Sequence, residues 1–173
     1  MEPTLTLKLK PISRSGVTEA LSKITHYRYL NQFDEAESIC RDVIAADPDN
    51  QRARRMLGLV ITDQFVGKPS DNYAEAEQIF DSLADAYERA YYSGILHERR
   101  AKAQIRAGHL PHTVAGHFEE AMKHYEQAEK IRPSGNDDAI LRWNRCLRLL
   151  QGVTASADED EEIFEASDSA PLR

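Results

Sequence analysis

The hexapeptide NQFDEA at residues 31–36 recurs, with changes, as GHFEEA at residues 116–121. In both copies an aromatic residue, an acid and an alanine stand at the same offsets, and a proline follows twelve residues after the alanine, at Pro48 and Pro133. An apolar pattern of helical period fills each interval. Such a unit is typical of stacked helix pairs, which offer a binding surface rather than a catalytic pocket.

The same periodicity extends over most of the chain and predicts an all-α fold. Pro48 and Pro133 end two helices, and the Asp49-Asn50 pair can cap the helix that follows Pro48. The Ser93-Gly94 pair breaks a run that would otherwise be too long for one helix. We expect seven helices, at residues 17–31, 34–47, 51–65, 72–90, 94–107, 117–131 and 137–150.

The two ends of the chain have different patterns. Within residues 1–16, Leu5, Leu7 and Leu9 alternate with polar residues, which predicts a short extended segment before the linker. A lone strand is not stable, so we expect it to lie along the first helices or to pair with another chain. Residues 153–173 are predicted to be a disordered acidic tail that follows a helical domain at residues 17–152.

The formal net charge of −7 is concentrated in this tail. Residues 153–173 hold seven acids and one base, so the rest of the chain is close to neutral. Ile163 and Phe164 stand among the acids, either as accidental composition or as a short docking motif. The tail could therefore occupy a basic groove of its own or of a neighbouring molecule.

The composition and the absence of known motifs argue against several classes of function. Cys40 and Cys146 lie far apart within apolar helical patterns, so we expect buried thiols rather than a disulfide or a zinc site. No apolar run is long enough to span a bilayer, and a cytoplasmic protein without membrane contacts is expected. No phosphate-binding glycine loop or nucleophile elbow is present, so neither an enzyme nor a cofactor is predicted. The basic excess is too small to favour nucleic acid. Trp143, flanked by Arg142 and Arg145, could form a base-stacking platform, but at helical spacing a core position is favoured for it.

The repeated residues resemble the tetratricopeptide repeat (TPR) family from about residue 17 to residue 150. The resemblance implies a right-handed α-α superhelix of three helix pairs closed by a terminal solvating helix. The matching positions of the first unit are Tyr27, Asn31, Phe33, Glu35, Ala36, Cys40, Val43 and Pro48; those of the second are Leu57, Gly58, Tyr73, Glu75, Ala76, Phe80 and Leu83; those of the third are Ala101, Gly108, Phe118, Glu120, Ala121, Tyr125, Ala128 and Pro133.

The spacing departs from the family repeat of about 34 residues. Ala36 and Ala76 are 40 residues apart, and Ala76 and Ala121 are 45 apart. We place the extra residues in two loops, around residues 65–71 and 109–115, which should emerge from one edge of the stack and form a lip.

In such a stack the first helix of each pair lines the concave side, and helical spacing selects its exposed residues. Six bases and three acids are expected there, so the groove should be basic; the acids are Asp63, Glu98 and Asp137. Arginine forks suit carboxylates, and an acidic peptide is the expected partner; the alternative is that these arginines only form surface ion pairs. The predicted peptide-binding residues are Arg28, Tyr29, Arg52, Arg55, Leu59, Lys102, Arg106, Asn144 and Arg148.

Three functions remain open. The first is a non-catalytic adaptor that binds an extended, acidic peptide. The second is a structural protein that self-associates through the N-terminal strand or the final helix. The third is a metal-dependent activity at a histidine cluster, where His117, Glu120 and His124 share a helical face, although ordinary surface histidines are the favoured interpretation.

Overall fold

The computed structural model describes residues 7–152, and these residues form helices and connecting turns without a strand. This confirms the prediction of an all-α fold with seven α-helices for that part of the chain. The elements are a 3-10 turn, η1 (Arg14–Gly16), then α1 (Val17–Tyr29), α2 (Phe33–Ala46), α3 (Gln51–Asp63), α4 (Tyr73–Asp81), α5 (Ala86–Arg106), α6 (Pro111–Lys130) and a last helix at residues 138–152.

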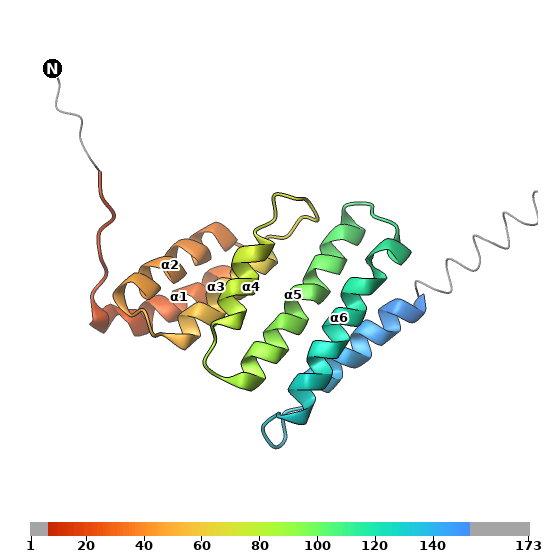
Figure 1. The fold of residues 1–173 in the computed structure, drawn as a ribbon. Coiled ribbons are helices and arrows are strands. Elements are labelled where there is room, and N and C mark those ends of the chain that lie inside the picture. Colours follow the sequence, from red (N-terminus) through yellow and green to blue (C-terminus); the bar gives the residue numbers. More distant parts are fainter. Residues whose placement is uncertain (1–6, 153–173) are drawn as a thin grey trace, which may run out of the picture.

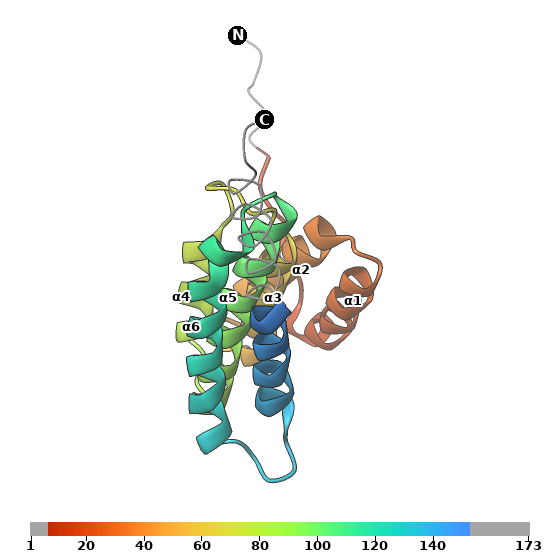
Figure 2. The same cartoon turned by 90° about the vertical axis from the view of Figure 1, so that its right-hand side faces the viewer.

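The helices are arranged side by side in chain order, from α1 and α2 at one end to α6 and the last helix at the other (Figure 1). Each of the helices α1 to α6 packs on the next one, and α3 also contacts both α1 and α5. Figure 2 shows α4 and α6 on one side of the stack, with α1 and the last helix on the other. This nearest-neighbour packing is compatible with a helical solenoid.

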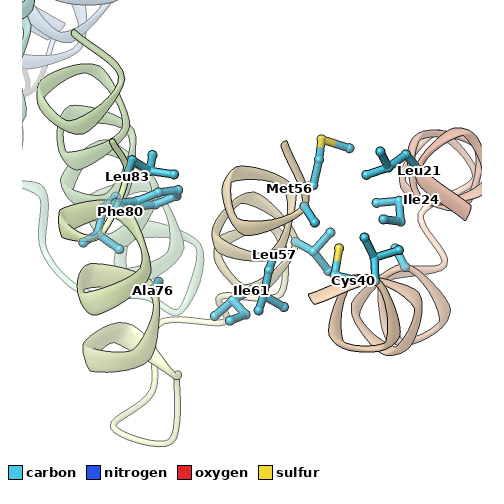
Figure 3. Packing of buried hydrophobic residues seen from close by; sticks show 14 of the residues in the cluster. Leu21, Ile24, Cys40, Met56, Leu57, Ile61, Ala76, Phe80 and Leu83 are labelled. Atoms are coloured by element: carbon cyan, nitrogen blue, oxygen red, sulfur yellow. The ribbon is translucent and has the colours of Figure 1, made fainter. Parts of the chain in front are cut away.

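Two apolar clusters form the core. The first joins α1 to α5, from which Leu96 and Ala103 take part, and Figure 3 shows Leu21, Ile24 and Cys40 on one side of α3, with Phe80 and Leu83 on its other side. The second joins α5 and α6 to the last helix, which contributes the fully buried Ala139 and Cys146. Both cysteines are free and buried, as predicted.

Two glycines allow neighbouring helices to approach closely. A Cβ atom at Gly58 of α3 would stand 2.4 Å from the ring of Phe80, and one at Gly94 of α5 would stand 2.5 Å from the ring of Tyr125. Both rings are fully buried. At each of these two crossings, a glycine on one helix leaves the space that a large aromatic ring of the next helix fills.

The predicted break at Ser93-Gly94 is wrong. α4 ends at Asp81 and α5 begins at Ala86, so the predicted 72–90 helix is divided at residues 82–85. The carboxylate of Asp85 caps α5 by accepting a hydrogen bond from the amide of Glu88 (2.8 Å). Gly94 lies inside α5 because the crossing with α6 leaves no room for a side chain, not because the helix ends there.

The predicted loop around residues 109–115 is also wrong. α6 begins at Pro111, because proline has no N–H and the first turn of a helix needs none. Only residues 107–110 separate α6 from α5, so the extra residues lengthen α5 and α6 to 21 and 20 residues. The loop predicted around residues 65–71 is present, between the end of α3 and the start of α4.

The extended N-terminal segment does not pack along the first helices over its described part. Leu7 is 84% exposed and Leu9 is 93% exposed, whereas Ile12 packs against the first core cluster. The expectations for residues 1–6 and for the acidic tail at residues 153–173 lie outside the described residues. Among residues 7–152, no helix has both the length and the apolar character of a membrane span.

Candidate binding face

The predicted site residues lie on one set of helices. Tyr29, Arg52, Arg106 and Arg148 are exposed, and the other five are half-buried. We use the name α1–α3–α5 face for that part of the surface of α1, α3, α5 and the last helix on which these nine residues lie. Its predicted residues are Arg28 and Tyr29 on α1, Arg52, Arg55 and Leu59 on α3, Lys102 and Arg106 on α5, and Asn144 and Arg148 on the last helix.

Asp63 joins three helices of this face. Arg28 of α1 donates to Oδ2 of Asp63 through Nε (2.8 Å) and forms an ion pair with it through Nη2 (2.7 Å). Arg99 of α5 reaches the other oxygen, Oδ1, through Nη1 (2.7 Å). The Nη1 group of Arg99 also donates to the backbone carbonyl of Leu59 (2.9 Å). One carboxylate on α3 therefore fixes an arginine on each side of it.

Glu98 is the centre of a second network and is fully buried. Lys102 forms an ion pair with its Oε1, and Arg142 of the last helix donates to the same oxygen at 3.2 Å. The hydroxyl of Tyr125 donates to Oε2 (2.6 Å). Burial by itself would raise the pKa of Glu98, but the hydrogen bonds from Lys102 and Tyr125 outweigh it and hold that pKa below its usual value.

The face keeps an excess of positive charge although its cations are paired. In each network two cations share one carboxylate, so one positive charge is left over. Arg55 forms an ion pair with Glu88, which neutralises both. Among the described residues, Arg52 has no ion pair, and Arg106 makes only a 3.5 Å contact to the carbonyl of Phe65. An anionic ligand would meet ordered cations here, because the acids near them are already occupied.

Sequence reasoning placed Asp63 and Glu98 on this face but did not identify their partners. Arg99 was not predicted at all, and Arg142 was considered only beside Trp143 as a base-stacking platform. As the helical spacing favoured, Trp143 packs against the second core cluster; it also donates through Nε1 to Glu126 (3.0 Å). A local signal was available, since a carboxylate in an apolar helical stripe requires cations around it.

The histidine cluster lies away from this face, between α5 and α6. The ring of His97 stacks with those of His124 and His117, at centroid distances of 5.3 and 6.4 Å. The hydroxyl oxygen of Tyr73 on α4 lies 3.2 Å from Nδ1 of His97, at hydrogen-bond distance. Burial lowers the pKa of His97 to about 4, and His124 contributes to the shift; burial also lowers the pKa of His117. Within residues 7–152, no three potential ligands are placed to hold a metal ion.

No family model matches the chain, and no match was found among curated proteins or among solved structures.

Proposed function

We propose that this protein is a non-catalytic adaptor of the tetratricopeptide type, which binds an extended acidic segment on its α1–α3–α5 face. The observation that carries the proposal is the sharing of Asp63 and of Glu98 by two cations each. This arrangement leaves a positive face built from four alternate helices of the chain, namely α1, α3, α5 and the last helix. The exposed Arg52 and Arg148 and the 88% exposed Tyr29 extend it toward solvent.

The repeat assignment is supported by recurring contacts rather than by spacing. Gly58 faces Phe80 in the second helix pair, and Gly94 faces Tyr125 in the third. In the first pair the sizes are reversed, since Ile24 on α1 lies near the small Cys40 of α2 (Figure 3). Gly94, rather than Gly108, is then the small residue at the helix crossing of the third pair. One small and one large partner at each crossing is the packing that a stack of similar units requires.

The arginine side chains of the face are already ordered, and this favours the binding of an acidic peptide. Ion pairs hold the side chains of Arg28, Arg99 and Arg142, so little side-chain entropy is lost when a ligand carboxylate binds. Tyr29 offers a ring to an apolar residue of the ligand. Because the peptide itself must be ordered, we expect an affinity in about the micromolar range and weaker binding as salt rises.

The test is fluorescence anisotropy of the full chain with a labelled synthetic peptide rich in glutamate and containing one phenylalanine. The variant Arg52→Glu/Arg148→Glu should weaken binding about tenfold or more, because two exposed cations become anions. The matched control is Lys10→Glu/Lys130→Glu, which makes the same change of net charge at two exposed positions off the face. Equal losses of peptide affinity in both variants would mean that net charge alone causes the effect, and this would contradict the proposal.

Self-association is the second candidate function, and the exposure of Leu7 and Leu9 favours it. Two apolar side chains on an extended segment are suited to pairing with another copy of the chain. Light scattering of the full chain should then show an oligomer that Leu7→Asp/Leu9→Asp converts to a monomer. A monomer in both cases would remove this candidate.

A further inference from the structure

A cleft of about 250 Å³ opens at the edge of the stack, between the loop at residues 64–72 and α5. Phe65 and Tyr73 contribute aromatic walls, and Gln104 lies among the lining residues. Lys68, Arg100 and His109 bring three basic side chains to the same space. None of these residues belongs to the predicted set on the α1–α3–α5 face, so the cleft is a separate feature.

The loop that forms one wall of the cleft is fixed in place. The carboxylate of Asp71 accepts hydrogen bonds from the backbone amides of Val66 (3.1 Å), Gly67 (2.8 Å) and Lys68 (3.2 Å). Gly67 has a φ of +78°, and a Cβ atom there would stand 2.5 Å from the carbonyl oxygen of Ala103. The loop is therefore pressed against α5, and the cleft is formed before any ligand arrives.

The basic groups of the cleft are not neutralised by nearby acids. The guanidinium of Arg100 lies 4.2 Å from the ring centroid of Tyr73, in a cation–π contact. Within the described range, neither Arg100 nor Lys68 forms an ion pair. Asp71 is occupied by backbone amides. Glu77 on α4 and Glu120 on α6 both act on the pKa of Tyr73, but neither is among the residues that line the cleft.

We propose that the cleft binds the chain's own acidic segment at residues 158–165. That segment reads DEDEEIFE, so it offers carboxylates to Lys68 and Arg100 and the ring of Phe164 to the aromatic walls. The negative charge and the aromatic ring that the cleft requires are both present in this one short stretch of the sequence. A cleft of this size holds an aromatic side chain and an adjacent carboxylate, not a whole peptide.

The segment can reach the cleft. The last helix runs from the opposite edge of the stack toward the edge at which the 64–72 loop lies (Figures 1 and 2). Phe164 is twelve positions after Gly152, and an extended chain of twelve steps spans about 40 Å. Packed helices lie about 8–10 Å apart, so crossing the helices between the two sites requires about 30 Å or less. Binding there leaves the α1–α3–α5 face free for a partner.

The experiment is disulfide trapping in the full chain under mild oxidation with oxidised glutathione. Gln104→Cys places a thiol in the cleft without changing its charge, and Ala166→Cys places one just after the acidic segment. The native Cys40 and Cys146 are fully buried and do not compete. The control pair is Asn144→Cys with Ala166→Cys, because Asn144 lies on the α1–α3–α5 face and is nearer to residue 166 along the chain.

We expect the intramolecular disulfide of the cleft pair to form about tenfold faster than that of the control pair, because docking raises the effective concentration. Adding Phe164→Ser or Arg100→Gln to the cleft pair should remove the difference, and thermal melting checks that each variant is folded. Equal rates for the two pairs, faster trapping at Asn144→Cys, or trapping only between molecules would each overturn the proposal. Peptide binding on the α1–α3–α5 face is measured separately, so either proposal can fail alone.

Discussion

The first half of the molecule, α1 to α4, and the second half, α5, α6 and the last helix, have cores of different chemistry. Among the described residues the buried polar side chains are Thr62 and Glu98, one in each half. Thr62 is uncharged, and its hydroxyl donates to the carbonyl of Leu59 in its own helix (2.9 Å) and accepts from Nη1 of Arg99 on α5 (2.5 Å). Glu98 depends on side chains from α5, α6 and the last helix. The second half is therefore more sensitive to the loss of one group.

The largest effect is expected from Glu98→Gln. The substitution keeps the shape but leaves Lys102 and Arg142 without their carboxylate, and we expect a loss of about 2–4 kcal/mol in the free energy of unfolding. Urea denaturation measures it. The control is Glu126→Gln, the same change at an exposed site where the carboxylate accepts from Trp143, with an expected cost below about 1 kcal/mol. Similar losses would remove the distinction between the two halves.

The next effect comes from the two close helix crossings. A Cβ atom meets an aromatic ring at both Gly58 and Gly94, but the hydroxyl of Tyr125 is tied to Glu98 whereas Phe80 has no polar tether. We expect Gly94→Ala to cost about 2–3 kcal/mol and Gly58→Ala about 1–2 kcal/mol, each partly offset by the better helix propensity of alanine. Thermal melting of both variants gives the order, and the reverse order would show that the tether does not hold the ring.

The third effect depends on pH and also belongs to the second half. Burial lowers the pKa of His97 from 6.5 to about 4. As the pH falls below about 6.5, His97 binds a proton in the unfolded chain but stays neutral in the folded chain. The free energy of unfolding therefore decreases between pH 6.5 and 4. Because His97 is partly exposed, we expect a loss of about 1–2 kcal/mol over this range.

His97→Gln should remove this part of the pH dependence, and His26→Gln on α1 is the matched control. Denaturation midpoints at several pH values above 4.5 separate it from the titration of Glu98, whose pKa lies below the usual value of 4.5. Unchanged pH profiles in both variants would exclude His97 as the source.

The smallest effect is expected at the junction of the two halves. Asp63→Asn leaves Arg28 and Arg99 without their shared charge, but all three side chains are partly exposed, so we expect a loss of about 1 kcal/mol. Asp81→Asn, at an exposed position of α4, is the control and should be close to neutral. A loss as large as that of Glu98→Gln would mean that burial does not set the cost.

The helices of the first half were predicted to within two residues over α1, α2 and α3, because their ends have local causes. Asn50 caps α3 by accepting from the amide of Ala53 (2.9 Å), and Pro48 stands two residues before it. A local signal was missed further on, since Asp85 and Glu88 have the spacing of a capping box at the start of α5. Gly94 was wrongly predicted to interrupt a helix. The true reason for this glycine, the ring of Tyr125, lies on the next helix and cannot be recognised from neighbouring residues.

Helix type, apolar period and most helix ends followed from the sequence, since they depend on neighbours a few residues apart. The partners of Asp63 and Glu98, and the reason for a glycine within α5, came only from the folded arrangement. These features depend on side chains that are distant in the chain and meet when the helices pack, and a single sequence carries no record of which charges or rings will face each other.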